Sequence, residues 1–202
     1  ASFDSLEISW RHQYDAEVYT KADTLTRERK VFTNYTQPAV LDDGRIMALR
    51  TAMDDIPKVV ALGSDGPEEI LFFPGNFNAR AFSSNGRQIV WSETRRDIRW
   101  EHRSWSEIHI YDILSGKKER LTQRSRFFSP AVSPCGNYIA AIEIGLANEC
   151  SVVLLSSDDA DILKRFGAPA HGFFMTPSWS ADGKSIVLVL LTETGKDLLE
   201  LN

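Results

Sequence analysis

The chain has 202 residues, of which 43% are hydrophobic and 25% are charged. These proportions are those of an ordinary globular protein with a substantial buried core, as one large domain or two small ones. The formal net charge of −5 argues against nucleic-acid binding, which usually relies on a basic surface. No apolar run approaches the roughly 20 residues that cross a bilayer. The opening residues, ASFDSLE, do not resemble a signal peptide.

Residues 1–36 are predicted to form three strands, at 5–10, 17–21 and 27–33, with a turn at 22–24. These strands match the later units of the chain if the first strand of a unit is missing. We therefore expect a partial structural unit at this end, and we expect no helix in any part of the sequence.

Four later stretches repeat one pattern: a short strand, an Asx-Gly or Cys-Gly turn, and a second strand. The turn glycines are Gly44, Gly86, Gly136 and Gly183, spaced by 42, 50 and 47 residues. Each repeat continues with a variable loop, a third strand, a Gly/Ser/Asp-rich turn and an outer strand. Strand repeats of roughly 40–50 residues are typical of propeller blades.

The sequence therefore predicts an all-β fold, a β-propeller of four-stranded antiparallel blades. The second strands, at 138–144 and 186–191, are apolar at nearly every position. This is expected where both faces of a blade are packed. The predicted ring is partial, with about four blades and both ends truncated. It forms a single domain over 1–202, divided into a partial blade (1–36), three blades (37–74, 75–123, 124–166) and a partial blade (167–202).

The two cysteines, Cys135 and Cys150, are predicted to be free thiols. Cys135 lies in the turn before a second strand, and Cys150 lies beyond the far end of that strand. About seven strand residues at roughly 3.3 Å each separate them by some 20 Å. A disulfide needs Cα atoms within about 7 Å.

Two stretches carry a resemblance to a known family. They are Ser129-Pro130-Ala131-Val132-Ser133-Pro134-Cys135-Gly136, preceded by Leu121-Thr122, and Pro177-Ser178-Trp179-Ser180-Ala181-Asp182-Gly183-Lys184. Both resemble the WD40-like (PD40) repeat of TolB-type β-propellers, which is written LT…SPxWSPDGxxIxF. Cys135 takes the place of the motif Asp, and Leu41 takes that of the motif Ser. These positions shape a turn, so the substitutions concern turn stability and no chemistry.

The resemblance covers all 202 residues as a repeat, and it implies a fold more than a function. The same blades occur in TolB, in the propeller domains of prolyl-oligopeptidase-type peptidases and in many envelope proteins. TolB-like rings usually have six or more blades, so we expect the chain to be a piece of a longer protein. The resemblance also implies a bacterial source and a periplasmic or cell-envelope location.

Sequence motifs for catalysis are missing. There is no Gly-x-Ser-x-Gly elbow, no His-Glu-x-x-His pair and no Gly-x-x-x-x-Gly-Lys loop, the motifs of serine hydrolases, metallopeptidases and nucleotide binding. The histidines (His12, His102, His109 and His171) are not spaced as metal ligands. His12 and His102 fall in equivalent loops, which leaves a metal site near the ring axis as a weak alternative. We predict no enzyme activity for this chain, no cofactor and no metal.

One predicted loop, at residues 94–105, combines positive charge with aromatic area. Its candidate binding residues are Arg95, Arg96, Arg99, Trp100, His102, Arg103 and Trp105. Arg and Trp are enriched in binding hot spots. Alternatively, the tryptophans pack the loop onto its own blade and the arginines pair with neighbouring carboxylates. Loops of this kind share one propeller face with the connections between blades, so Arg126 and His171 are predicted to lie nearby.

The function predicted is that of a non-catalytic scaffold module that binds a protein or a ligand. The alternative is the non-catalytic propeller domain of a multidomain hydrolase or peptidase. The predicted partner is a protein or a component of the cell envelope, with no nucleic acid and no membrane span. Self-association through the incomplete blades is also expected, because each blade depends on its neighbours for burial.

Overall fold

The computed structural model describes residues 3–16, 24–27, 29–63, 66–100 and 102–202. It contains one helix and fifteen strands among these residues. The elements are α1 (Phe3–Ala16), β1 (Thr33–Val40), β2 (Ile46–Ala52), β3 (Lys58–Leu62), β4 (Glu69–Phe72), β5 (Phe77–Ser84), β6 (Gln88–Arg96), β7 (Ser104–Asp112), β8 (Lys117–Arg120), β9 (Phe127–Val132), β10 (Tyr138–Ile144), β11 (Cys150–Ser156), β12 (Ile162–Gly167), β13 (Phe173–Trp179), β14 (Ile186–Thr192) and β15 (Gly195–Leu201).

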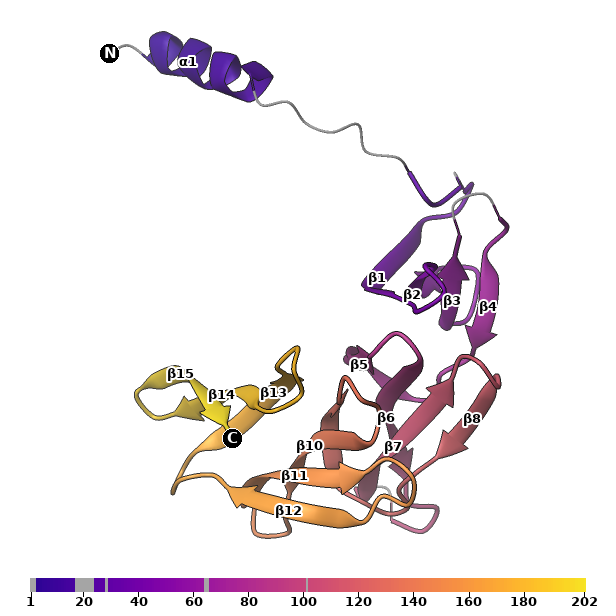
Figure 1. Ribbon diagram of the computed structural model, residues 1–202, viewed down its shortest axis with the longest axis vertical. Helices are drawn as coiled ribbons and strands as arrows, with labels where there is room; N and C mark the ends of the chain where they lie inside the picture. The colour runs from indigo at the N-terminus through magenta and orange to yellow at the C-terminus, as the bar shows by residue number, and fades with distance from the viewer. Residues whose placement is uncertain (1–2, 17–23, 28, 64–65, 101) are drawn as a thin grey trace.

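The strands form four antiparallel sheets, each from strands that are consecutive in sequence. The orders are β1-β2-β3-β4, β5-β6-β7-β8, β9-β10-β11-β12 and β13-β14-β15, so the last sheet has three strands in the described part of the chain. Figure 1 shows the sheets following one another along an open arc, with α1 apart from them. The predicted all-β fold, a partial propeller with four-stranded antiparallel blades, is confirmed.

The prediction for the amino-terminal residues was wrong. Residues 5–10 lie within α1 and not in a strand, so the chain does contain a helix. Leu6, Ile8 and Trp10 alternate with polar residues as in a strand, but Glu7 and Arg11 form an i,i+4 ion pair at 3.1 Å, which is helical spacing. A helix satisfies its backbone hydrogen bonds internally, whereas a strand needs a neighbour.

The other two strands predicted for the leading partial blade are not seen either. Residues 17–21 lie outside the described part of the chain. Residues 24–27 and 29–32 have no regular structure, and the first strand of the first sheet begins at Thr33. The described residues of the first sheet therefore span 33–72.

The repeated turns have the predicted chemistry. Gly44, Gly86, Gly136 and Gly183 all have positive φ, between 69° and 96°, a backbone conformation that favours glycine. In three of these turns the residue before the glycine is Asp or Asn, and its Oδ1 atom accepts a hydrogen bond from the backbone N–H two residues later. In the last turn, for example, Asp182 accepts from Lys184 at 3.2 Å. At the fourth turn Cys135 replaces the Asx residue. Hydrogen bonds with the Ser133 hydroxyl and the Asn137 N–H lower the pKa of the Cys135 thiol, so the sulfur takes over part of the capping role.

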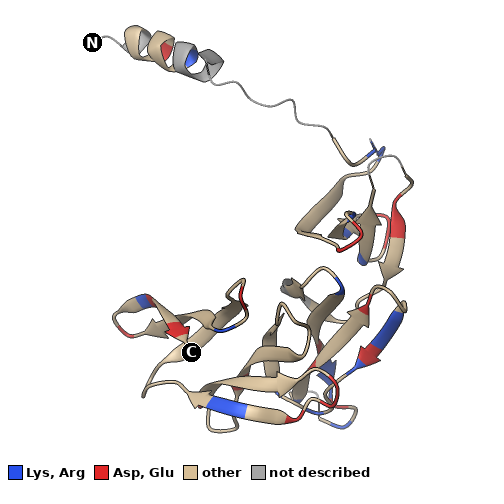
Figure 2. Ribbon diagram, viewed as in Figure 1, with Lys and Arg blue, Asp and Glu red and all other residues tan. Residues whose placement is uncertain are grey.

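The turns lie on one rim, because neighbouring turns touch one another. The N–H of Asp42 donates to the carbonyl of Gly86 at 3.0 Å. The side-chain amide of Asn85 donates to the carbonyl of Ser133 at 3.1 Å. Charged residues gather instead on the outer strands β8 and β12 (Figure 2), which suits an exposed sheet edge.

Apolar side chains fill the space between successive sheets and form three core clusters. Strand β10 contributes to two of them. Ile139 and Ala141 face the second sheet, whereas Ala140 and Ile142 face the fourth. The first three of these residues are 0% exposed, so the third sheet is buried on both faces, as the apolar run of residues 138–144 predicted.

The inner strands carry a feature that the sequence analysis did not predict. Gln37, Ser129 and Thr176 each precede a proline and have φ between 46° and 55°. At each site the strand pairing shifts register, which is a β-bulge. Positive φ is uncommon for residues other than glycine, and here it occurs where a bulge interrupts the regular strand conformation. Both cysteines are free, as predicted, with Cys135 exposed and Cys150 buried.

The buried Trp91 and the half-buried Glu93 on β6 and His109 on β7 form a polar group within the second sheet. The Trp91 indole is 0% exposed, donates to Glu93 Oε1 at 2.9 Å and stacks on the His109 ring at 5.6 Å. Burial lowers the pKa of His109, although the Glu93 charge opposes this. Burial alone would raise the pKa of Glu93, but hydrogen bonds from the Gly75 N–H, the Trp91 indole and Lys118, together with the charge of His109, lower it overall.

We predict a pH-dependent stability that His109 controls. Because its folded-state pKa is depressed, the unfolded chain takes up a proton that the folded chain resists, and stability falls as pH drops below about 6.5. One proton gives a slope of at most about 1.4 kcal/mol per pH unit. Urea unfolding between pH 7.5 and 5.5 should show a smaller slope for His109→Gln than for wild type. Equal slopes would assign this pH dependence to other groups.

A second prediction concerns the packing between sheets. Ile139→Ala should lower the free energy of unfolding by about 2–4 kcal/mol, because it leaves a cavity in the core between the second and third sheets. The matched control is Ile162→Ala on the outer strand β12, where the side chain is 43% exposed and the expected loss is within about 0.5 kcal/mol. Urea unfolding measures both, and similar losses would contradict the packing assigned to β10.

Candidate functional site

The predicted loop at 94–105 is shorter in the structure, because strands β6 and β7 extend into it. Arg95 pairs with Trp105 and Arg96 with Ser104 across the hairpin, so the connecting segment is 97–103. Asp97 fixes this segment: its Oδ1 atom accepts the N–H of Arg99 at 2.8 Å and that of Trp100 at 3.3 Å. The side chains at 95, 96 and 105 are therefore positioned by a sheet.

A cavity of about 550 Å³ lies beside the end of this hairpin. We call it the arginine cavity. It brings together six of the nine predicted site residues, namely Arg95, Arg96, Arg99, Trp100, Arg103 and Trp105. Its other lining residues are Asp97, Ile98, Glu107, Arg120, Gln123 and Arg124.

The remaining three predicted residues do not line this cavity. His102 is exposed on the same loop. Arg126 lies in the connection between β8 and β9, where its backbone bridges to Ser106. His171 lines a different cavity of about 450 Å³ beside the connection between β12 and β13. His171 belongs to the next connection between sheets, where it lies beside the β10–β11 loop at Ala147–Glu149 and not beside the β6–β7 hairpin.

Glu107 forms the floor of the arginine cavity and was missed in the sequence analysis. It is 2% exposed. Its carboxylate accepts the backbone N–H of Arg124 at 2.8 Å and the side-chain N–H of Arg120 at 3.5 Å, and lies 3.9 Å from the Arg95 guanidinium. A buried carboxylate requires such partners. Glu107 thereby holds arginines of β6, β8 and the β8–β9 connection around one centre.

The β8–β9 connection is itself fixed to β7. The Ser106 hydroxyl donates to the carbonyl of Phe127, and the Ser125 hydroxyl donates to the carbonyl of Ser106, both at 2.6 Å. The two walls of the cavity, hairpin and connection, are thus tied together beside Glu107. Arg124 has φ of 52°, an uncommon conformation for a residue other than glycine.

Positive charge dominates the lining. The lining contains six arginines and two acids. Both acids already accept hydrogen bonds from the protein: Asp97 from backbone N–H groups of its loop, and Glu107 from the backbone N–H of Arg124. Arg96, Arg99, Arg103 and Arg124 form no ion pair with any residue that the structure describes. This excess stands out in a chain with a net charge of −5, and it suits an anionic ligand.

The two tryptophans of the cavity differ in their surroundings. Trp105 is half-buried, with the Arg103 guanidinium 4.6 Å from its ring centre, so it partly fits the interpretation of a packed loop. Trp100 is 65% exposed and offers a flat apolar surface to a ligand. The cavity therefore contains one tryptophan that is held by packing, Trp105, and one that is largely exposed to solvent, Trp100.

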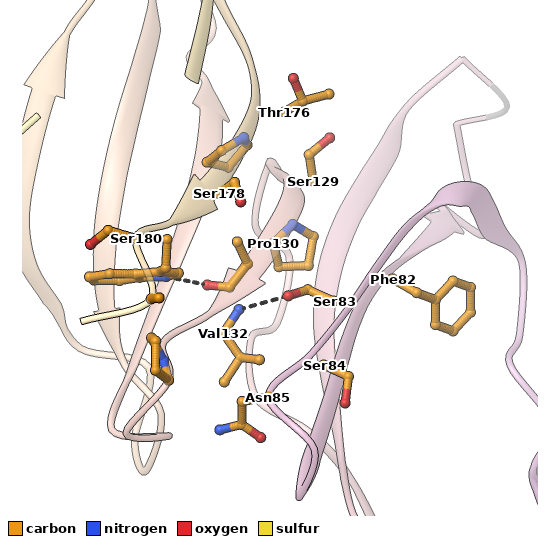
Figure 3. Close-up of a pocket in the computed structure, with 15 residues that line it drawn as sticks. Phe82, Ser83, Ser84, Asn85, Ser129, Pro130, Val132, Thr176, Ser178 and Ser180 are labelled. Carbon is orange, nitrogen blue, oxygen red and sulfur yellow. Dashed lines mark hydrogen bonds between the residues drawn. The ribbon is translucent and has the colours of Figure 1, made fainter. Parts of the chain in front are cut away.

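A second cavity, of about 470 Å³, lies along the inner strands β5, β9 and β13 (Figure 3). Seven of its lining side chains bear a hydroxyl or amide group, and none is charged: Ser83, Ser84, Asn85, Ser129, Thr176, Ser178 and Ser180. Two of its hydrogen bonds connect neighbouring sheets. The Trp179 indole donates to the carbonyl of Ala131 at 2.9 Å, and the N–H of Val132 donates to the Ser83 hydroxyl at 3.2 Å.

Among the described residues, no group of three or more His, Cys, Asp and Glu side chains could hold a metal ion. In the same part of the chain, no helix has the length and apolar character needed to cross a membrane.

Comparison with known proteins identifies the fold. No protein-family profile and no curated protein matches the sequence. Solved structures do match. TolB from Acinetobacter baumannii is 16% identical over 84% of this chain and 41% of its own, with a TM-score of 0.63. An oligogalacturonate lyase from Vibrio parahaemolyticus is 12% identical over 88% of this chain and 52% of its own, with a TM-score of 0.66.

A structure of prolyl endopeptidases is also similar, at 15% identity over 83% of this chain and 28% of its own, with a TM-score of 0.58. The chain thus spans about half, or less, of the length of these three proteins. The fold is a partial β-propeller. It is similar to the fold of TolB structures, in agreement with the resemblance drawn from the repeat. At these identities the likeness concerns the fold alone.

The role of Asp97 can be tested directly. Asp97→Ala removes the acceptor for two loop N–H groups, so the amides of Arg99 and Trp100 should exchange about tenfold faster, the effect of one typical hydrogen bond. The free energy of unfolding should change by less than about 0.5 kcal/mol, because the loop is exposed. Hydrogen exchange by NMR measures this, with Asp158→Ala on another exposed turn as the control. Unchanged exchange would show that the loop is ordered by other contacts.

Proposed function

We propose that this chain is a non-catalytic binding module, and that its ligand surface is the arginine cavity. The observation that carries the proposal is the excess of six arginines over two acids around one cavity in an acidic chain. Four of these guanidinium groups have no carboxylate partner among the described residues, and that of Arg103 lies over the Trp105 ring.

The ligand proposed is an acidic segment of a partner protein. Guanidinium groups bind carboxylates in a fixed, often bidentate geometry. The exposed ring of Trp100 adds the kind of rigid contact area found at the centre of protein interfaces. Arg95, Arg96 and Trp105 stand on paired strands, which limits the conformational entropy lost on binding.

A location in the bacterial periplasm or cell envelope is proposed with this function. It is supported by the likeness to TolB and by the repeat pattern. Fractionation of cells that express the natural gene tests the location, and recovery in the cytosolic fraction would contradict it.

A second candidate function is that of a propeller domain in a multidomain hydrolase or peptidase. The likeness to prolyl endopeptidases supports it, since this chain covers 28% of that structure. In this case the catalytic residues would belong to another domain. The coding sequence that flanks this chain distinguishes the two functions, because a Gly-x-Ser-x-Gly motif there would favour the hydrolase.

We predict that a fluorescent oligoglutamate peptide binds the chain, and that binding weakens with added salt because charge pairs at a surface are screened. Arg99→Ala/Arg103→Ala should reduce its affinity by about tenfold or more. Lys164→Ala/Lys184→Ala is the matched control: it removes the same charge from exposed positions on β12 and on a rim turn.

Fluorescence anisotropy measures both affinities, and circular dichroism establishes that the variants remain folded. Equal affinities of the two variants would withdraw the arginine cavity as the ligand surface. In that case the packed-loop interpretation of residues 94–105 would hold.

A further inference from the structure

Three loops lie on the rim opposite the glycine turns. Strands β2, β6 and β10 each begin at one of those turns and end at the loop that leads to the third strand of the same sheet. These loops are residues 53–57, 97–103 and 145–149. The strands have seven, nine and seven residues and so span about 20–30 Å. We call the far rim, with its three loops, the loop rim.

Each of these loops exposes a large apolar side chain, which we call its tip. Ile98 is fully exposed, Leu146 is 88% exposed and Met53 is 86% exposed, the three highest values among the large apolar residues that the structure describes. Single exposed apolar residues are ordinary on a protein surface. Here, however, they occupy the equivalent loop of three successive sheets, each with all four strands. This coincidence indicates a shared surface, although the corresponding loop of the fourth sheet, 193–194, is polar.

The three loops are ordered by their own acidic residues. Asp55 forms an ion pair with Lys58 at 2.7 Å. Asp97 and Glu149 accept backbone N–H groups of their own loops at 2.8 and 2.9 Å. These three acids are thus occupied within the protein, whereas the apolar tips extend into solvent. The exposure of the tips is therefore built into the loops.

Positive charge lies between the second and third tips. The β8–β9 connection, which carries Arg124 and Arg126, is hydrogen bonded on both sides. The N–H of Ser106 on β7 donates to the carbonyl of Ser125 at 3.0 Å, and the N–H of Ile144, the last residue of β10, donates to the carbonyl of Arg126 at 3.2 Å. The arginine cavity adjoins the same connection. Neither of the two arginines forms an ion pair with a described residue.

Separate prominences of this kind suit a lipid surface better than a protein surface. A protein partner needs a matching pocket for each protruding side chain, and the hot spots of protein interfaces are packed together near the centre of a patch. The boundary between headgroups and acyl chains is fluid and accepts apolar side chains wherever they enter. Trp100, in the same loop as Ile98, is also exposed, and Trp is enriched at membrane–water interfaces.

The arginines of this rim favour an anionic lipid surface. Binding to a membrane surface strengthens with buried apolar area and with attraction to anionic lipids. Arginine suits such a position, because its aliphatic stem lies along apolar surface while the guanidinium reaches a phosphate. Asp54 is exposed beside Met53 and opposes the attraction. The second and third loops, which flank the arginines, are therefore expected to contribute most.

We propose that the loop rim docks onto an anionic lipid bilayer. Met53, Ile98 and Leu146 enter the boundary between headgroups and acyl chains, and the neighbouring arginines bind lipid phosphates. The chain then lies on the membrane with the glycine turns facing away from the lipid. Docking shares arginines with the proposed binding of an acidic segment, but it also needs the apolar tips, which an acidic segment does not.

Flotation with lipid vesicles tests this proposal. The chain should bind vesicles of phosphatidylcholine with about 30% phosphatidylglycerol at least about tenfold more tightly than vesicles of phosphatidylcholine alone. Ile98→Ser/Leu146→Ser should weaken binding to the anionic vesicles by about tenfold, because two apolar side chains no longer enter the lipid. The matched control, Val40→Ser/Leu114→Ser, removes two largely exposed apolar side chains from the opposite rim and should bind as wild type does.

A further variant separates this proposal from the proposed function. Met53→Ser/Leu146→Ser leaves every lining residue of the arginine cavity unchanged. It should weaken binding to the anionic vesicles, whereas the oligoglutamate peptide should bind it as it binds wild type. The changed side chains are exposed, so the variants should fold, and circular dichroism checks this.

Two results would overturn the docking proposal. The first is a wild-type chain that does not float with the anionic vesicles, which would leave the tips to a protein partner. The second is vesicle binding that Arg99→Ala/Arg103→Ala abolishes but that the tip variants leave unchanged, because adsorption would then be electrostatic only.

Discussion

Burial of each sheet between its neighbours is the interaction on which the rest of this structure depends. Strand β10 shows it most clearly, since Ile139 and Ala140 are both 0% exposed although they point to opposite faces. A single four-stranded sheet cannot bury two apolar faces alone, so each blade is stable only in the stack. Hydrogen bonds such as that from the Trp179 indole to the carbonyl of Ala131 then fix how adjacent sheets sit.

The stack also determines where binding groups can gather. Because successive sheets lie side by side, the β6–β7 hairpin end and the β8–β9 connection meet, and Glu107 is buried where they join. The arginine cavity is the result: a rigid framework holds positive charge that the surrounding residues only partly neutralise.

The sequence composition indicated the kind of residues that line the arginine cavity, but it did not indicate all the residues that line it. The density of Arg and Trp at 94–105 drew attention to this segment, because that composition is unusual in an acidic chain, and six of its predicted site residues line the arginine cavity. Glu107 and Arg120 escaped notice, since an isolated Glu or Arg in a strand carries no local signal. Their role arises only when β7 and β8 are paired beside the hairpin end. His171 was included because connections between sheets share one face of a propeller. That argument does not say which loop a given connection lies beside, and His171 lies beside the β10–β11 loop.

The sequence by itself determined the repeat, the turns and the sheets, because these depend on local chemistry: Asx-Gly turns and apolar strand runs have the same meaning wherever they occur. Only the tertiary structure decided the rest. Leu6, Ile8 and Trp10 fit either a strand or a helix, and in the structure that segment is the helix α1. The burial of Glu107 likewise depends on residues that are separated from it in sequence, such as Arg124. Such contacts leave no local pattern, because the chain must fold before those residues meet.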